Sequence, residues 1–446
     1  MERMFGTDGV RGIANTELTC DMAFKLGQAA VAFLGHTIII GKDTRRSGDM
    51  LESALAAGIM SMGGSALLAG IIPTPAIALL TRELYCDGGV VISASHNPPA
   101  YNGIKFFNSQ GFKLPDALED EIEAFITGGG ANKSDLPEGD MVGVAVPIEN
   151  ACGLYIDHAV KSIEAQGLRF DGLHIALDTA HGASSTTSEE AFLRLGARVT
   201  VINSDFNGTD INVECGSTNL APLKKLMEET GADVGIAHDG DADRVMFVGA
   251  GGKEIDGDMV EAVCALDLKE RGLLQGNMVA TTVMCNLGFM HAMRNAGIEV
   301  LQTKVGDRYV LEAMLEKGCV IGGEQSGHII MLDHNSTGDG LLVACQFLAA
   351  CRRQGKTVEE ATSVMTSVPQ VLINVHGVDK AALSTNNNVT QAIAAAGEEL
   401  GDTGRVLIRP SGTEPLIRVM VEAFDPAQAT QVAERLAEVV KTELAL

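Results

Sequence analysis

A short stretch around Ser95 combines a hydroxyl group, an imidazole and a cation. Residues 90–92 (Val-Val-Ile) have the β-branched composition of a buried strand. The turn after them contains Ser95, His96 and two prolines, and Lys105 follows ten positions after Ser95. Polar turns at strand ends are frequent ligand sites in α/β proteins, so Ser95 is a candidate nucleophile. The alternative is an ordinary Asn/Pro turn in which Ser95 is only a cap.

Three carboxylates follow another apolar segment at alternate positions, namely Asp239, Asp241 and Asp243. Like charges this close repel one another unless a cation neutralises them, and carboxylate oxygens are suitable ligands for Mg²⁺. An EF-hand also uses alternate acidic positions, but Arg244 stands where that loop needs glycine and Ala250 where it needs glutamate. We therefore expect a Mg²⁺ site here rather than a solvated acidic turn.

Two further loops combine small residues with groups that recognise phosphates or sugars. Residues 409–413 (Arg-Pro-Ser-Gly-Thr) offer a guanidinium, two hydroxyls and a glycine amide, which together suit a phosphate dianion, although a generic turn is the alternative. Residues 323–328 (Gly-Glu-Gln-Ser-Gly-His) place an acceptor beside small donors, a combination that suits sugar hydroxyls. These two loops, a hydroxyl nucleophile and a metal site are the parts needed for phosphoryl transfer on a phosphosugar.

Strand-like and helix-like segments alternate along most of the chain, so these loops should lie at the ends of strands in α/β domains. The first domain contains the Ser95 turn, and its alternation predicts a largely parallel sheet. From restarts and changes in the pattern we expect four domains, at residues 1–149, 150–247, 248–367 and 368–446.

Composition limits the functional classes. The chain has 446 residues, a 46% hydrophobic content and a formal net charge of -25, which argues against nucleic-acid and anionic-membrane partners. Its nine cysteines include no C-x-x-C pair, as expected of reduced thiols. Residues 1–12 do not have the pattern of a signal peptide, and no apolar run reaches spanning length. We therefore expect a cytoplasmic protein.

The loops, in this order, resemble those of the α-D-phosphohexomutase superfamily. Within it they are most similar to the bacterial phosphoglucosamine mutases, and the resemblance extends over nearly the whole chain. The segments that carry it are residues 5–12 (Phe-Gly-Thr-Asp-Gly-Val-Arg-Gly), 215–218, 303–309, 322–328 and 411–418.

The resemblance implies a four-domain, heart-shaped α/β architecture: three similar α/β domains with mixed sheets and a smaller C-terminal α+β domain. Ser95 would be a phosphoserine, and one Mg²⁺ would be held by Ser95, Asp239, Asp241 and Asp243. The other catalytic candidates, whose roles as acid, base or charge stabiliser stay open, are His96, Lys105, Arg11 and Arg244. The substrate-binding candidates are Lys304, Glu324, Ser326, His328, Arg409, Ser411, Gly412, Thr413 and Arg418.

The implied reaction interconverts glucosamine 6-phosphate and glucosamine 1-phosphate, with glucosamine 1,6-bisphosphate as intermediate and activator. The resemblance also allows a homodimer.

Three alternatives remain. Pro99 and Tyr101 are more typical of the phosphomannomutase/phosphoglucomutase branch. A haloacid dehalogenase-type phosphatase would use Asp239 as nucleophile and Asp241 as acid, and would leave Ser95 unexplained. A sugar-phosphate-binding protein without catalysis would not need a phosphorylated Ser95.

Overall fold

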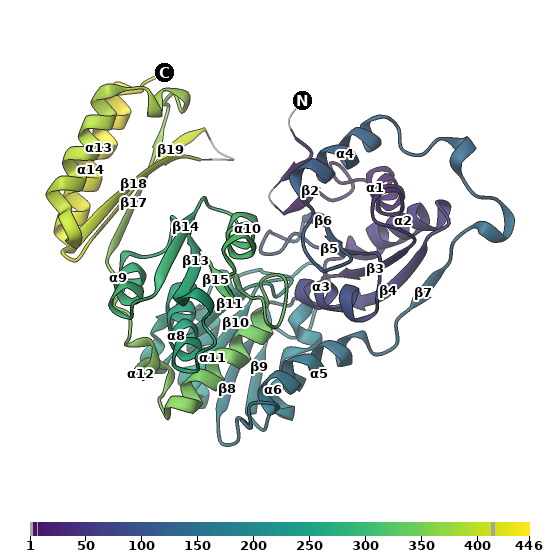
Figure 1. Ribbon diagram of the computed structural model, residues 1–446, viewed down its shortest axis with the longest axis horizontal. Coiled ribbons are helices and arrows are strands. Elements are labelled where there is room, and N and C mark those ends of the chain that lie inside the picture. The colour runs from purple at the N-terminus through teal and green to yellow at the C-terminus, as the bar shows by residue number, and fades with distance from the viewer. Residues whose placement is uncertain (1–2, 7, 412–414) are drawn as a thin grey trace. The chain divides into compact units, whose positions relative to one another are not determined.

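The computed structural model describes residues 3–6, 8–411 and 415–446. The chain forms two compact units (Figure 1). The first comprises Met1–Met284 and Ile298–Val364 and contains three β-sheets. The second comprises Cys285–Gly297 and Met365–Leu446 and contains one sheet.

The first sheet has the strand order β1-β2-β6-β5-β3-β4-β7. Strands β5, β3, β4 and β7 run parallel to one another, whereas β1 with β2, β2 with β6 and β6 with β5 pair antiparallel. The expected largely parallel sheet was therefore wrong, because the chain returns antiparallel to β5 directly after the Ser95 turn. The elements are β1 (Phe5–Gly6), β2 (Gly9–Ile13), α1 (Cys20–Phe33), β3 (Thr37–Lys42), α2 (Gly48–Ser61), β4 (Ser65–Ile71), α3 (Thr74–Glu83), β5 (Gly88–Ile92), β6 (Tyr101–Asn108), α4 (Asp116–Thr127) and β7 (Ala145–Pro147).

Both faces of this sheet are covered by helices. Ile38, Ile40, Val90 and Ile92 belong to a buried apolar cluster with residues of α1 and α2. The intervening positions of the strands point to the opposite face. There a Cβ at Gly41 would lie 2.6 Å from the Ile77 side chain of α3, so only glycine allows this helix to pack so closely. Burial on both faces explains why β3 and β5 are continuous apolar runs.

The second sheet has the order β12-β11-β10-β8-β9, with β10, β8 and β9 parallel. The third has the order β14-β13-β15-β16, with β16 antiparallel to β15. The elements of this region are α5 (Ala151–Glu164), β8 (His174–Asp178), α6 (Ser188–Arg194), β9 (Arg198–Ile202), α7 (Ala221–Thr230), β10 (Val234–His238), β11 (Val245–Val248), β12 (Glu254–Ile255), α8 (Gly257–Glu270), β13 (Met278–Thr282), β14 (Glu299–Thr303), α10 (Asp307–Lys317), β15 (Ile321–Gly323), β16 (Ile329–Met331), α11 (Gly340–Gln354) and α12 (Val358–Thr362).

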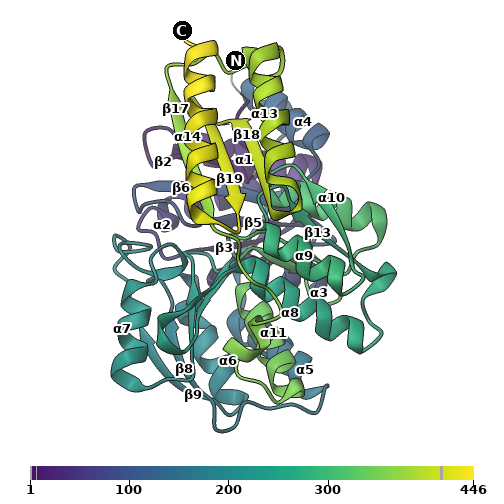
Figure 2. The same ribbon diagram turned by 90° about the vertical axis from the view of Figure 1, so that its left-hand side faces the viewer.

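The second unit is an antiparallel sheet of order β17-β19-β18 with helices α13 and α14 side by side on one face (Figure 2). Helix α9 belongs to this unit although it lies between β13 and β14 in sequence. Its N-cap, Asn286, donates hydrogen bonds to the carboxylate of Glu422 and the carbonyl of Val368. The bounds are α9 (Leu287–Asn295), β17 (Gln370–His376), α13 (Asn387–Leu400), β18 (Gly404–Pro410), β19 (Leu416–Ala423) and α14 (Pro426–Glu443).

Among the described residues, no helix is both long and apolar enough to cross a membrane.

An aromatic pair packs the second sheet against α11, and its removal should lower the stability of the first unit. Phe247 on β11 and Phe347 on α11 are fully buried, with ring centroids 4.7 Å apart. We expect Phe247→Ala to lower the free energy of unfolding by about 3–5 kcal/mol because it leaves a cavity. Urea unfolding followed by circular dichroism measures the loss. Leu315→Ala, at a half-exposed position, is the control, and an equal loss there would contradict the assignment.

Candidate active site

The Ser95 loop, residues 93–101, leads from β5 into the first residue of β6, and its residues 93–95 are buried. Ser95 is only 1% exposed and adopts a left-handed backbone conformation with φ of 50°. Its Oγ donates a hydrogen bond to Oδ2 of Asp239 at 2.5 Å. His96 Nδ1 lies 3.4 Å from the same Oγ. Burial, together with the charges of Arg244 and Arg11, lowers the pKa of His96 to about 4, so its imidazole is neutral near pH 7.

The carboxylate cluster, Asp239, Asp241 and Asp243, follows directly after β10. All three side chains are buried, and one ligand oxygen from each lies within 4.8 Å of the others. Asp241 Oδ1 and Asp243 Oδ1 have no hydrogen-bond partner in the described part of the chain. Buried carboxylate oxygens without partners are costly unless a cation completes them. The donor set consists of hard oxygens, which fits Mg²⁺.

The ionisation of this cluster follows from burial and from its neighbours. Burial, Asp243 and Asp241 raise the pKa of Asp239 well above its ordinary value. Burial alone would also raise the pKa of Asp241, but the charge of Lys105 outweighs it and lowers that pKa. Asp241 Oδ2 accepts hydrogen bonds from Lys105 at 2.8 Å and from the Thr74 hydroxyl at 2.6 Å. The three chemically identical groups are therefore not electrostatically equivalent.

Lys105 lies at the centre of a buried ion network. Its Nζ is 2.8 Å from Asp8 Oδ2 and from Asp241 Oδ2, and 3.7 Å from Asp243 Oδ2. Burial would lower the pKa of Lys105, but the carboxylates of Asp241, Asp8 and Asp243 outweigh that effect and raise it. The surrounding carboxylates therefore favour the protonated, cationic form of Lys105.

The network extends from Asp8 to the third sheet. Arg11 pairs with Asp8, and Lys113 bridges Asp8 and Asp307, the first residue of α10. His328 is buried, with its Nε2 3.4 Å from Asp307 Oδ2 and 4.0 Å from Asp243 Oδ2. This chain of charges connects the surroundings of Ser95 to the loop after β15.

The remaining sugar-binding candidates of the first unit lie around that loop. Glu324 Oε1 accepts a hydrogen bond from the amide of Gly306 at 3.2 Å. Ser326 and Lys304 are exposed, and the Lys304 ammonium lies 5.9 Å from the Tyr309 ring centroid. Arg244 is partly buried beside Asp243, with its Nε 3.8 Å from Asp243 Oδ1. The structure thus brings Ser95, His96, Lys105, Arg11, Arg244, His328 and the carboxylate cluster into one connected region.

The phosphate-binding candidates occupy the second unit. Arg409 on β18 pairs directly across from Arg418 on β19. Burial and the charge of Arg418 lower the pKa of Arg409. Two guanidinium groups at facing positions repel each other, and an anion between them would relieve that repulsion. Ser411 is buried, with its amide bonded to the carbonyl of Leu416 and its carbonyl accepting from Lys380. Gly412 and Thr413 lie outside the described residues.

Sequence reasoning did not identify several residues of this network, above all Asp8, Lys113 and Asp307. Asp8 and Asp307 stood in segments that the resemblance singled out, but without a role. Their ion pairs join positions far apart in sequence, and no local spacing signals them. Lys105, in contrast, could be recognised from the sequence, because it is a lone cation between apolar residues of the buried strand β6.

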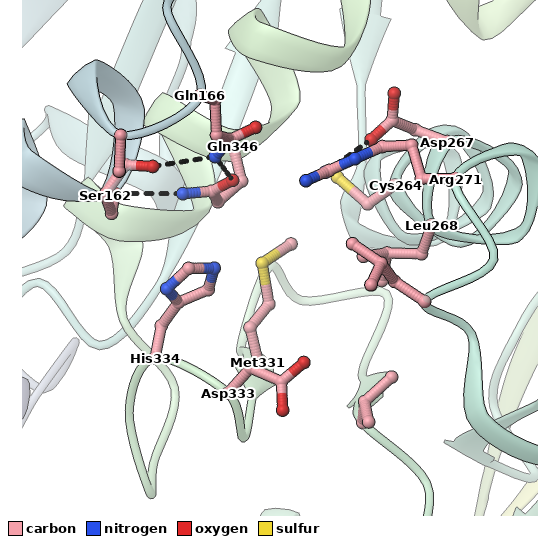
Figure 3. Close-up of a pocket in the computed structure, with 13 residues that line it drawn as sticks. Ser162, Gln166, Cys264, Asp267, Leu268, Arg271, Met331, Asp333, His334 and Gln346 are labelled. Atoms are coloured by element: carbon pink, nitrogen blue, oxygen red, sulfur yellow. Dashed lines mark hydrogen bonds and ion pairs between the residues drawn. The ribbon is translucent and has the colours of Figure 1, made fainter.

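A separate cavity of about 280 Å³ contains none of the candidate residues (Figure 3). Several of its polar side chains bond to one another: Gln346 accepts from Gln166 and donates to Ser162, and Arg271 pairs with Asp267.

The carboxylate cluster predicts a measurable loss of metal binding. Asp243→Asn removes one anionic ligand, and we expect it to weaken Mg²⁺ binding at least about tenfold, because even the loss of an indirect metal contact costs that much. Isothermal titration calorimetry with Mg²⁺ measures the change. Asp140→Asn, an exposed carboxylate, is the control. Unchanged affinity in Asp243→Asn would contradict this assignment of the metal site.

Comparison with protein families matches four models named phosphoglucomutase/phosphomannomutase. They are α/β/α domain I at residues 2–133, domain II at 154–252, domain III at 256–368 and the C-terminal domain at 372–439. The chain is 48% identical to a phosphoglucosamine mutase of Carboxydothermus hydrogenoformans, covering 99% of this chain and 100% of that protein. It is 49% identical to one of Clostridium novyi, covering 99% of each.

Solved structures with the same fold match this chain over its whole length or nearly so. A phosphoglucomutase/phosphomannomutase family protein of Burkholderia thailandensis has a TM-score of 0.84 at 22% identity, covering 100% of this chain and 99% of that one. An Aspergillus fumigatus N-acetylphosphoglucosamine mutase, solved with GlcNAc-6P and magnesium, has a TM-score of 0.71 at 16% identity, covering 99% and 96%.

Proposed function

The chain belongs to the phosphoglucomutase/phosphomannomutase family and is an isomerase, and from this premise we propose that it interconverts glucosamine 6-phosphate and glucosamine 1-phosphate. The expected α/β fold class, with three mixed sheets and a smaller C-terminal α+β part, is confirmed. The proposed substrate follows from relatives named phosphoglucosamine mutase. This chain matches them over their full length or nearly so.

One observation carries the proposed chemistry: the hydroxyl of Ser95 lies 2.5 Å from a carboxylate of the cluster. A serine buried among metal-binding oxygens is placed to carry a phosphoryl group, because the same cation can offset the charge of both. We infer that Asp239, Asp241, Asp243 and the phosphoryl group of Ser95 hold Mg²⁺. When bound, Mg²⁺ would supply charge neutralisation for the transferring phosphoryl group.

In the proposed cycle the bond between Ser95 Oγ and phosphorus breaks, and a hydroxyl oxygen of the sugar phosphate bonds to that phosphorus. This gives glucosamine 1,6-bisphosphate and free Ser95, whose Oγ takes up the hydroxyl proton. The other phosphoryl group then returns to Ser95, so no proton or phosphate is gained overall. Asp239 and His96 are the groups near enough to exchange that proton with Ser95. Lys105, which its carboxylate neighbours keep cationic, would stabilise charge on the transferring group.

The remaining roles are assigned by chemistry. Glu324, Ser326 and His328 would bind sugar hydroxyls or the amino group, and Lys304 would contact the sugar phosphate. Arg11 and Arg244 would offset the charge of the transferring group. Arg409 and Arg418, facing each other across two strands, would bind the phosphate that does not react, with Ser411, Gly412 and Thr413. The cytoplasmic location, the homodimer and the four domain boundaries stay predictions.

The phosphoserine assignment predicts that Ser95→Ala is folded but inactive. We expect kcat to fall at least about a thousandfold, because the group that accepts the phosphoryl is lost. Mass spectrometry of the native protein should find a phosphoryl group on the Ser95 peptide that resists hydroxylamine. Ser53→Ala, at an exposed position of α2, is the control. A hydroxylamine-labile label on the Asp239 peptide would favour the phosphatase alternative, and full turnover in Ser95→Ala would exclude the phosphoserine cycle.

Substrate preference decides between the branches of the family. With Mg²⁺ and a sugar-bisphosphate activator, we expect kcat/KM for glucosamine 6-phosphate to exceed that for glucose 6-phosphate and mannose 6-phosphate at least about tenfold. The expected preference reflects the positively charged amine at C2, which acidic side chains bind more strongly than the neutral hydroxyl of glucose or mannose. A preference for glucose or mannose would instead support the reading from Pro99 and Tyr101.

A further inference from the structure

A buried arginine outside the proposed chemistry holds the backbone of the Ser95 loop. Arg45 follows β3, and its side chain is fully buried. Its Nη1 donates to the carbonyls of Pro98 at 2.5 Å and Tyr101 at 2.9 Å. Its Nη2 donates to the carbonyls of Ser95 at 3.0 Å and Asn97 at 2.7 Å. One rigid guanidinium therefore binds four carbonyls of the same loop.

Asp43 fixes this guanidinium and reaches Ser95 from the other side. Its Oδ2 accepts from Arg45 Nε at 2.9 Å and from the Ser93 hydroxyl at 2.6 Å. The Ser93 hydroxyl in turn accepts the amide hydrogen of Ser95 at 2.9 Å. The amide and the carbonyl of Ser95 are thus both held by one hydrogen-bonded network.

A second donor comes from the loop after β9. Asn212 Nδ2 lies 2.8 Å from the carbonyl of Ser95 and 3.3 Å from that of Asn97. These are two of the carbonyls that Arg45 already binds, so two separate segments converge on the same backbone atoms.

The backbone of Ser95, which these hydrogen bonds hold, has a rare conformation. Ser95 has φ of 50°, a left-handed region that residues other than glycine adopt mainly where the surroundings over-determine it. We propose that Arg45 and Asn212 are positioning residues: they hold Ser95 in this conformation and so direct its Oγ to Asp239. The inference rests on the proposed role of Ser95. Because Arg45 is buried under the loop, it acts without touching the substrate.

The test compares Arg45→Lys and Asn212→Gly with the wild-type enzyme. Lysine keeps the positive charge of Arg45 but lacks the planar guanidinium that donates to several carbonyls. Glycine readily adopts the positive φ of Asn212 (60°). Each substitution therefore removes mainly hydrogen bonds. We expect kcat with glucosamine 6-phosphate to fall about a hundredfold in Arg45→Lys and about tenfold in Asn212→Gly, with KM within twofold, because a misplaced nucleophile slows chemistry and not binding. Arg46→Lys, an exposed neighbour, is the control.

A second readout separates positioning from general destabilisation. The rate at which glucosamine 1,6-bisphosphate phosphorylates Ser95, measured by quenched flow and mass spectrometry, should fall in parallel with kcat while the melting temperature changes little. Wild-type phosphorylation rates in both variants would overturn the inference, as would a rise in KM that accounts for the loss. If Arg45→Lys does not fold, Asn212→Gly decides the matter alone. If the wild-type protein itself never carries phosphate on Ser95, the proposed function fails instead.

Discussion

The burial of mutually repelling carboxylates is the constraint on which the rest of the first unit depends. Asp239, Asp241 and Asp243 leave the end of β10 together and share one small volume. Their repulsion must be offset locally, since water cannot screen charges that are fully buried. Lys105 provides part of the compensation through Asp241. The buried oxygens that still lack a hydrogen-bond partner, Oδ1 of Asp241 and of Asp243, are the physical reason to infer a divalent cation.

The lysines that offset the buried negative charge also constrain where other strands and helices lie. Lys105 belongs to β6, so the first sheet must present this strand to the loop after β10 of the second sheet. Asp8 lies between Lys105 and Lys113, and Lys113 reaches Asp307 at the start of α10. One alternating series of charges thus links loops from three sheets. Such a series has a preferred arrangement, because displacing any member leaves a buried charge unpaired.

Local sequence patterns predicted the strands and loops but not the way in which the loops are connected. The β-branched run before Ser95 and the apolar run before Asp239 were sufficient to place both loops at strand ends. The strand β6 was missed because Asn102 and Gly103 have the composition of a turn. In the structure a Cβ at Gly103 would lie 2.4 Å from the carbonyl oxygen of Ser93, so the glycine permits close strand packing. A local pattern cannot distinguish these two uses of glycine.

The proposed mutase cycle gives a reason why the serine should be held so firmly. In the proposed cycle, one Ser95 would receive and return phosphoryl groups at two different positions of the same sugar. The substrate would then change its orientation between the two half-reactions, whereas Ser95 and the carboxylate cluster would serve both. A fixed centre retains the advantage of alignment in both half-reactions, and this advantage is lost with displacements of about 1 Å. The described groups that contact the Ser95 side chain all lie in the first unit, and Arg409 and Arg418 lie in the second.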